Sequence, residues 1–157
     1  SLYRLRRAIA IERDPALAVH WRAEAGNDPR LAALGTRWLA PADPAAASAG
    51  DAWLAHRLAL GVAEGRSELG DGEVLWLECN AAELNGVSFT KGCYIGQENT
   101  ARMNWRQKVG RRLLVVPLAR SNPARQRIAY PALGLAIDHL RVEDIAPDLL
   151  PAWLKLA

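Results

Sequence analysis

A single cysteine with charged neighbours is the strongest chemical signal in the chain. Residues 91–98 read Lys-Gly-Cys-Tyr-Ile-Gly-Gln-Glu, so Cys93 comes two residues after Lys91 and five before Glu98. The charge of Lys91 favours the thiolate, the form of cysteine that attacks electrophiles and binds metals. The carboxylate of Glu98 opposes a second negative charge, which leaves the direction of the thiol's pKa shift open. The spacing therefore predicts a functional thiol without fixing its chemistry.

The residues around Cys93 predict a tight turn that leads into a helix. Gly92 and Gly96 flank the cysteine, and a good helix-forming run begins at Gln97. A helix N-terminus would add a positive field and unpaired N–H groups near the thiol. Burial in a core would explain a lone cysteine, but the Gly-Cys-Tyr-x-Gly context favours a function. The second cysteine, Cys79, ends an apolar run and is interpreted as a core residue.

The metal-binding residue types show no ligand spacing. The two cysteines are fourteen residues apart, and the histidines His20, His56 and His139 are scattered. Neither a redox pair of the CxxC type nor a four-ligand zinc site fits this pattern. We expect no permanently bound metal, while Cys93 remains a candidate transient ligand of a cluster.

Composition sets wider limits on the class of protein. The 157 residues are half hydrophobic, which predicts a globular chain with one domain or two small subdomains. No apolar run is long enough to span a membrane and no secretory signal is visible. Two cysteines without a disulfide framework suit a reducing compartment. The net charge of +3 suits an anionic ligand or partner, although a solvated surface explains it equally well.

Hydrophobic periodicity predicts the elements that must position the thiol. Alternation indicates half-buried strands over 2–11 and 17–21, pairing as a hairpin, and a short strand at 37–39. A helix is expected to begin with Asp51 as its N-cap and to stop near Gly65. An extended core segment is expected at 74–77, and buried strands over 112–116, 127–130 and 133–140, beyond a break at Gly110. These elements predict an α+β fold.

Several segments together resemble the folate-binding YgfZ-type proteins, relatives of the glycine-cleavage T-protein (aminomethyltransferase) that support iron–sulfur cluster assembly. The octapeptide 91–98 matches the signature of that family almost letter for letter. The resemblance covers about residues 2–140 and is closest to the mitochondrial and alphaproteobacterial branch. Further matching segments are Tyr3–Arg6, Trp53 with Arg57 and Gly61, Leu77–Asn80, Leu84–Thr90, Thr100–Arg102 and Gly134–Ala136.

The resemblance implies a T-protein-like fold. It places an antiparallel sheet subdomain with packed helices, the folate-binding region, at 1–112, and a small β-barrel-like subdomain at 113–157. Family members have a substantial segment before the strand at residues 3–6 and a longer barrel. We therefore expect the chain to be part of a longer protein, with the barrel incomplete.

The resemblance also implies roles for individual residues. Glu78 is expected to bind the pterin ring of tetrahydrofolate, because a carboxylate can accept two adjacent N–H groups. Tyr94 is a candidate for stacking on the ligand, although ordinary packing explains it as well. Arg102 would meet the anionic tail of folate or pair with Glu98 on the same helix. The signature residues are Gly92, Gly96, Gln97 and Glu98.

The function implied is that of a tetrahydrofolate-binding accessory factor for assembly or repair of [4Fe–4S] proteins. Cys93 would act as nucleophile, redox-sensitive thiol or transient cluster ligand, and Lys91 would raise its thiolate character or steer an anion. Full ligation of such a cluster takes four thiolates, so iron–sulfur assembly or recipient proteins are expected as partners. The location would be the bacterial cytoplasm or the mitochondrial matrix, with no membrane partner.

Two other functions remain open at this stage. One is a true aminomethyltransferase that transfers a one-carbon unit to tetrahydrofolate, against which the cysteine signature and the lack of an Ala-Arg-Asp-x-Leu-Arg string both argue. The other is a basic RNA- or protein-binding module. A solvated helix face and strand edge explain that basic cluster more simply, so a nucleic-acid partner is not expected. The cluster consists of Arg102, Arg106, Lys108, Arg111 and Arg112.

Overall fold

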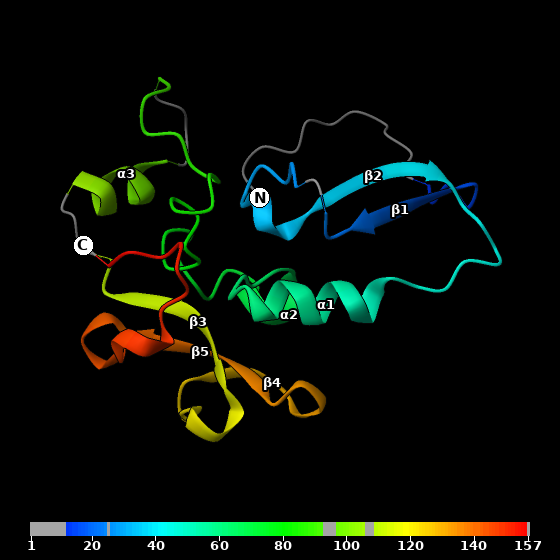
Figure 1. Ribbon diagram of the computed structural model, residues 1–157. Helices are drawn as coiled ribbons and strands as arrows, with labels where there is room; N and C mark the ends of the chain where they lie inside the picture. Colours follow the sequence, from blue (N-terminus) through cyan, green and yellow to red (C-terminus); the bar gives the residue numbers. More distant parts are fainter. Residues whose placement is uncertain (1–11, 25, 93–96, 106–108, 157) are drawn as a thin grey trace.

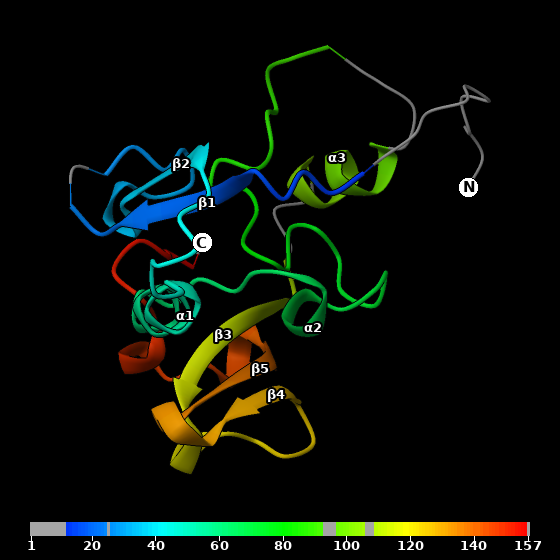
Figure 2. The ribbon, with the colours of Figure 1, turned by 90° about the vertical axis from the view of Figure 1, so that its right-hand side faces the viewer.

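The computed structural model describes residues 12–24, 26–92, 97–105 and 109–156. The strand expected over 2–11 lies outside these residues, and so does its expected pairing. The described elements are arranged in layers, with helix α1 between a two-stranded ribbon and a three-stranded sheet (Figures 1 and 2). No helix in this part of the chain is long and apolar enough to cross a membrane.

The ribbon confirms the strands expected at 17–21 and 37–39. Strand β1 (Leu17–Arg22) pairs antiparallel with β2 (Thr36–Pro41), and Val19 lies opposite Leu39. These two side chains are 66% and 69% exposed, so the ribbon turns an apolar face outward. Its other contacts anchor it to the helix layer, because the Trp21 ring packs edge-on against Trp53.

Helix α1 (Gly50–Ala59) begins and ends differently from the prediction. Its N-cap is Ala49, and Asp51 lies within the first turn, so the expected Asp51 cap is wrong. The chain leaves the helix at Gly61, whose φ of +74° lies in the left-handed region. A Cβ there would lie 2.9 Å from Pro151, so this tight contact requires glycine. The expected stop, Gly65, instead precedes the one-turn helix α2 (Arg66–Leu69).

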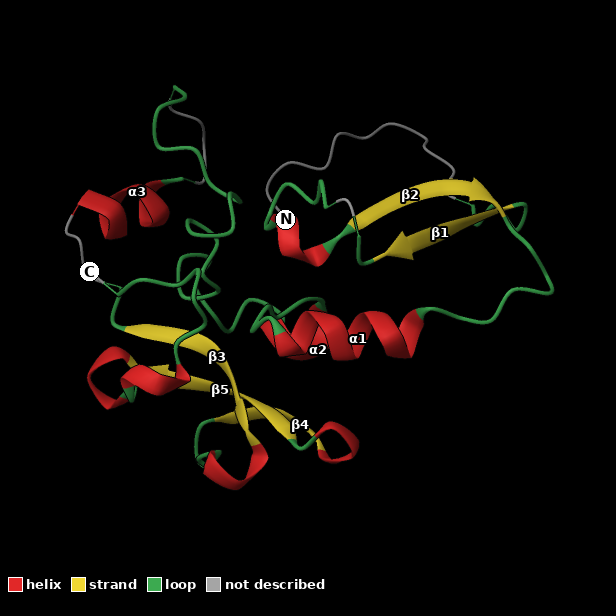
Figure 3. Ribbon diagram, in the orientation of Figure 1, coloured by secondary structure: helices red, strands yellow, loops and turns green. Residues whose placement is uncertain are grey.

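Residues 74–77 do not form the expected extended segment. They begin a run of turns, in which the amide of Cys79 donates to the carbonyl of Leu75. Asn80 then takes a left-handed φ of +61°, which bends the chain. The side-chain amide of Asn80 donates a hydrogen bond to the Leu113 carbonyl at 2.8 Å. Figure 3 draws the described path between α2 and α3 as loop and turn throughout.

The C-terminal sheet and the helix after the signature are as expected, except that the last strand begins at Leu135 and not at Leu133, which ends a 3-10 turn before the left-handed Gly134. Strands β3 (Arg111–Pro117), β4 (Gln126–Tyr130) and β5 (Leu135–Arg141) form an antiparallel sheet in the order β3-β5-β4. Helix α3 (Glu98–Trp105) precedes it. The α+β class is confirmed, while the T-protein-like arrangement and a barrel stay predictions. Short 3-10 turns complete the elements at Ala32–Leu34, Leu118–Arg120, Pro131–Leu133, Val142–Asp144 and Pro147–Leu149.

Helix α1 contributes to cores on both of its sides. Leu58 packs with Cys79 and with Leu113 and Ile137 of the sheet. On the ribbon side, Trp53 packs against a cluster formed by Leu34, Val62 and Leu84. Helix α3 has no fully buried residue among those described, and it lies beside the layers rather than between them (Figure 2). The element closest in sequence to Cys93 is therefore the least covered of the longer helices.

Candidate functional site

The structure describes the residues of the signature that lie before and after the segment 93–96. Cys93, Tyr94 and Gly96 lie outside the described residues, whereas Lys91, Gly92, Gln97 and Glu98 lie within them. Helix α3 begins at Glu98, which confirms the helix expected after the cysteine. Lys91 is two residues from Cys93 in the sequence, so the surface that the structure describes around Lys91 belongs to the signature segment.

A groove of about 250 Å³ lies against α3 at this place. We call it the signature groove. One wall comes from the segment before the cysteine and the other from the helix after it. Trp105, at the end of α3, is 89% exposed, and Phe89 on the opposite wall is also exposed. The lining residues are Val87, Ser88, Phe89, Lys91, Gln97, Thr100, Ala101, Asn104 and Trp105.

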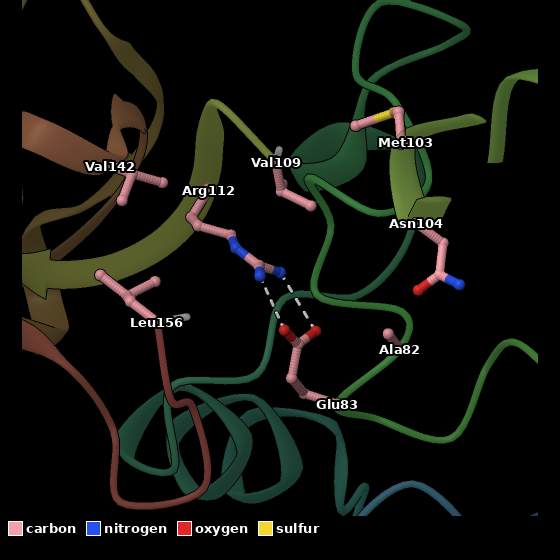
Figure 4. A pocket seen from close by; sticks show the side chains of 8 residues that line it. All are labelled: Ala82, Glu83, Met103, Asn104, Val109, Arg112, Val142 and Leu156. Carbon is pink, nitrogen blue, oxygen red and sulfur yellow. Dashed lines mark hydrogen bonds and ion pairs between the residues drawn. The ribbon is translucent and has the colours of Figure 1, made fainter. Parts of the chain in front are cut away.

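A second pocket, of about 280 Å³, also borders α3 and shares Asn104 with the signature groove (Figure 4). Met103 and Asn104 line it from the helix, and Arg112 and Glu83, joined by an ion pair, line it as well. The closest contact of that pair is 2.7 Å. Arg112 also donates to the Leu77 carbonyl at 3.1 Å, while its buried Nε has no hydrogen-bond partner.

The burial of Arg112 corrects one expectation from the sequence. The sequence predicts that Arg112 belongs to a basic cluster on a solvated surface, yet Arg112 is only 6% exposed. Its charge is matched by Glu83 and so is not offered to nucleic acid. The buried pair instead fastens the turns around residue 80 to β3, because Arg112 also contacts Asn80 Oδ1 at 3.3 Å.

Glu78 lies in a different place from the signature groove. Its carboxylate is largely buried, and Oε2 accepts a hydrogen bond from His139 Nε2 at 3.1 Å and from the Leu75 amide at 3.3 Å. Burial lowers the pKa of His139, and the nearby Glu78 carboxylate raises it in opposition. Glu78 also lines an open recess together with Arg111 and Arg141.

The structure does not gather all the predicted site residues in one described pocket. Lys91 and Gln97 line the signature groove, and Glu78 lines the recess beside the sheet. Arg102 is exposed on α3 and lines none of these three hollows. The groups proposed for the thiol chemistry and for the pterin therefore occupy separate surfaces of this part of the chain.

Cys79 is a core residue, as expected. It packs with Leu58, Leu113 and Ile137. Burial, and secondly the charge of Glu78, raise the pKa of its thiol to about 11. At neutral pH the thiolate is therefore scarce, and Cys79 is chemically inert. No group of three or more metal-ligating side chains occurs among the described residues.

Sequence reasoning missed Phe89 and Trp105 as site residues. The signal was present, since residues 98–105 read Glu-Asn-Thr-Ala-Arg-Met-Asn-Trp, a polar helix that ends in a large aromatic residue. Such a residue next to a functional thiol is a candidate for recognition.

Comparison with curated proteins finds several relatives of this chain. The chain is 41% identical to a protein of Homo sapiens over 98% of the chain and 51% of the relative. It is 36% identical to a protein of Mus musculus over 79% of the chain and 42% of that relative. A protein of Neurospora crassa is 38% identical over 59% of the chain and 23% of the relative. No protein-family model matches the chain.

These findings confirm the resemblance seen in the signature. The chain belongs to the YgfZ-type family of T-protein relatives. Within it, the human and mouse relatives are named iron-sulfur cluster assembly factor IBA57, mitochondrial, and the Neurospora protein is named as its homologue. The chain spans about half the length of the human relative, and smaller shares of the other two.

Proposed function

We propose that this chain is part of an accessory factor for the assembly or repair of [4Fe–4S] proteins and that Cys93 is the thiol through which it acts. The observation that carries the proposal is the signature Lys-Gly-Cys-Tyr-Ile-Gly-Gln-Glu in a chain similar to named iron–sulfur cluster assembly factors. The names of those relatives also support action in the mitochondrion. In a bacterium, the corresponding place would be the cytoplasm.

The cluster is the cargo in this proposal, and Cys93 supplies one ligand to it. The remaining ligands must come from elsewhere, because a [4Fe–4S] cluster takes four thiolates. Lys91 lies two residues from the thiol and favours the thiolate that binds iron. The inert Cys79 does not compete for the cluster, since it is buried with a pKa near 11.

Replacing Cys93 by alanine should abolish the function without disturbing the fold. We expect the activity of [4Fe–4S] enzymes to fall to the level of a deletion, in cells whose only copy is the Cys93→Ala form of the complete protein. The amount of protein and its unfolding midpoint should not change. Enzyme activity, protein abundance and thermal unfolding measure the three quantities.

Peptide-resolved alkylation supplies a control for this experiment. At pH 7.5 a thiol with a pKa near 11 holds about 300-fold less thiolate than an ordinary thiol with a pKa of about 8.5. Iodoacetamide should therefore spare Cys79 in the native protein and label it only after unfolding. Normal [4Fe–4S] enzyme activity in the Cys93→Ala cells would remove the thiol from the mechanism.

We further propose that Glu78 contributes to tetrahydrofolate binding. Its Oε1 accepts no hydrogen bond from the described residues, so one oxygen is available for a pterin N–H group. Arg111 in the same recess suits the anionic tail of folate, whereas Arg141 there is paired with Glu143. These residues fit the polar edge and the tail of the ligand, while none of the described residues that line the recess is aromatic.

The matched variants Glu78→Gln and Glu73→Gln test this role. Glutamine preserves an acceptor for His139 and Leu75 but removes the charge, so the affinity for tetrahydrofolate should fall about 10- to 150-fold, the equivalent of about 1.5–3 kcal/mol. Glu73 is exposed and paired with Arg127, so its variant should bind normally. Calorimetric titration of the complete protein measures both affinities. Equal binding by the two variants would exclude Glu78 from the folate site.

A further inference from the structure

One asparagine of the chain is followed by glycine, the neighbour that favours spontaneous deamidation most. The chain has six asparagines, and Asn85 alone precedes a glycine, Gly86. Asparagine is thermolabile, because the backbone nitrogen of the next residue can attack its side-chain amide carbon. Glycine has no side chain to shield that nitrogen and has the widest backbone freedom, so the attack is least hindered there. Asn85 is therefore the asparagine of this sequence whose chemistry most needs control by the fold.

The attacking nitrogen is held in a hydrogen bond. The backbone amide of Gly86 donates to the Ala81 carbonyl at 2.6 Å, and the backbone amide of Asn85 donates to the Ala82 carbonyl at 3.2 Å. Asn85 has a left-handed φ of +57°. These are the features of a Schellman motif, whose left-handed position is taken by glycine or asparagine. The Gly86 nitrogen therefore cannot attack the Asn85 side chain until this turn opens.

The side chain of Asn85 connects two distant parts of the fold. Its Nδ2 donates to the Pro29 carbonyl at 3.0 Å and to the Arg30 carbonyl at 3.5 Å. These two acceptors lie in the connection between β1 and β2, 56 and 55 residues earlier in the chain. The Asn85 amide therefore ties the ribbon to the turn segment 81–86, which precedes the signature.

Deamidation would reverse this interaction. The Gly86 nitrogen forms a bond to Asn85 Cγ and loses its proton, while the bond between Cγ and the side-chain nitrogen breaks and ammonia leaves. Water then opens the five-membered imide at either carbonyl, which gives aspartate or isoaspartate. The product carries a carboxylate, which accepts hydrogen bonds and donates none. It would face the Pro29 and Arg30 carbonyl oxygens, so attraction becomes repulsion.

We propose that Asn85 is a deamidation site whose reaction is controlled by the turn segment 81–86 and whose product releases that segment from the ribbon. The intact turn suppresses the reaction through the hydrogen bond between Gly86 and Ala81. Local opening of the segment sets the rate, because the attack needs a free backbone nitrogen. The reaction thus converts a transient opening into a permanent change. This inference is independent of the proposed function, since it involves neither Cys93 nor Glu78.

Peptide mapping by mass spectrometry measures the reaction. The complete protein is incubated at neutral pH, either folded or in urea, and the deamidated fraction is followed at Asn85. Asn99 is the control, because it is also exposed but precedes a threonine. We expect Asn85 to react at least about tenfold faster in urea than in the folded protein, and faster in urea than Asn99. Gly86→Ala should abolish the second difference. Equal rates at Asn85 in the folded protein and in urea would overturn the proposal, and so would equal rates at Asn85 and Asn99 in urea.

Two pairs of variants test the opening and its consequence. Arg112 donates to the carbonyl of Leu77, just before the segment, so Arg112→Ala should speed the reaction at Asn85 in the folded protein, while the exposed Arg141→Ala should not. Asn85→Asp reproduces one product and should lower the unfolding midpoint by about 2–4 °C. Asn99→Asp, at the start of α3, should not lower it. An unchanged midpoint in Asn85→Asp would show that the amide does not hold the segment to the ribbon. If Arg112→Ala fails to fold, the rates of the native protein in its folded form and in urea still decide.

Discussion

Glu68→Ala should destabilise the fold by about 3–5 kcal/mol, because it leaves a buried guanidinium without its counter-charge. Arg57 and Glu68 are 4% and 1% exposed. The two terminal nitrogens of the Arg57 guanidinium, Nη1 and Nη2, each donate to the Glu68 carboxylate at 2.7 Å, which makes a bidentate ion pair. Arg57 also donates to the Val62 carbonyl, and its Nε has no partner.

The same carboxylate connects three elements of the fold. Glu68 belongs to α2, while its partners come from α1 and from β4, where the Tyr130 hydroxyl donates to it at 2.6 Å. It also accepts the amide of Glu64 at 2.6 Å. Burial, and secondly the hydrogen bond to Glu68, raise the pKa of Tyr130 to about 12. Removing this side chain therefore breaks the hydrogen-bonded link between the helix layer and the edge strand β4.

Urea unfolding of the complete protein measures the effect. The matched control is Glu73→Ala, which removes an exposed ion pair with Arg127 and should cost at most about 1 kcal/mol. A double variant, Arg57→Met with Glu68→Leu, should recover much of the loss because it removes both charges together. Equal free energies of unfolding for Glu68→Ala and Glu73→Ala would contradict the interpretation.

The sequence predicts the elements whose pattern is local. The apolar run at 112–116 becomes the buried strand β3, and the polar run after Gln97 becomes α3. Residues 74–77 are equally apolar and yet form turns, because contacts with residues far along the chain determine their conformation. The left-handed Asn80 and its hydrogen bond to the Leu113 carbonyl fix the turn, and that carbonyl is 33 residues away.

The charged pairs of the interior lie beyond pattern reasoning for the same reason. The partners Arg57 and Glu68 are eleven residues apart, and Arg112 and Glu83 are twenty-nine apart. No periodicity connects such residues, and a buried arginine has the same sequence appearance as a surface one. The candidate site shows the same division, since the signature loop was found from the sequence and its groove only from the structure.

Arg112→Ala is expected to cost about 3–5 kcal/mol and to release the turns that carry Glu78. Its guanidinium donates to Leu77, Asn80 and Glu83, all within the segment that covers β3. Without it, the Glu83 carboxylate beside the pocket of Figure 4 loses its ion-pair partner. The destabilisation should be concentrated in residues 77–86, since the ribbon of β1 and β2 makes no hydrogen bond to Arg112.

Hydrogen exchange distinguishes this local effect from a general one. The amides of Leu84 and Gly86 donate within the turn segment and should exchange faster in Arg112→Ala than in the native protein. Amides of β1 should exchange at an unchanged rate. Arg141→Ala is the matched control, because it removes an exposed pair with Glu143 on the same sheet and should leave both regions protected. Equal acceleration in β1 and in the turns would show that Arg112 stabilises the whole fold and does not specifically anchor the segment that leads to the cysteine.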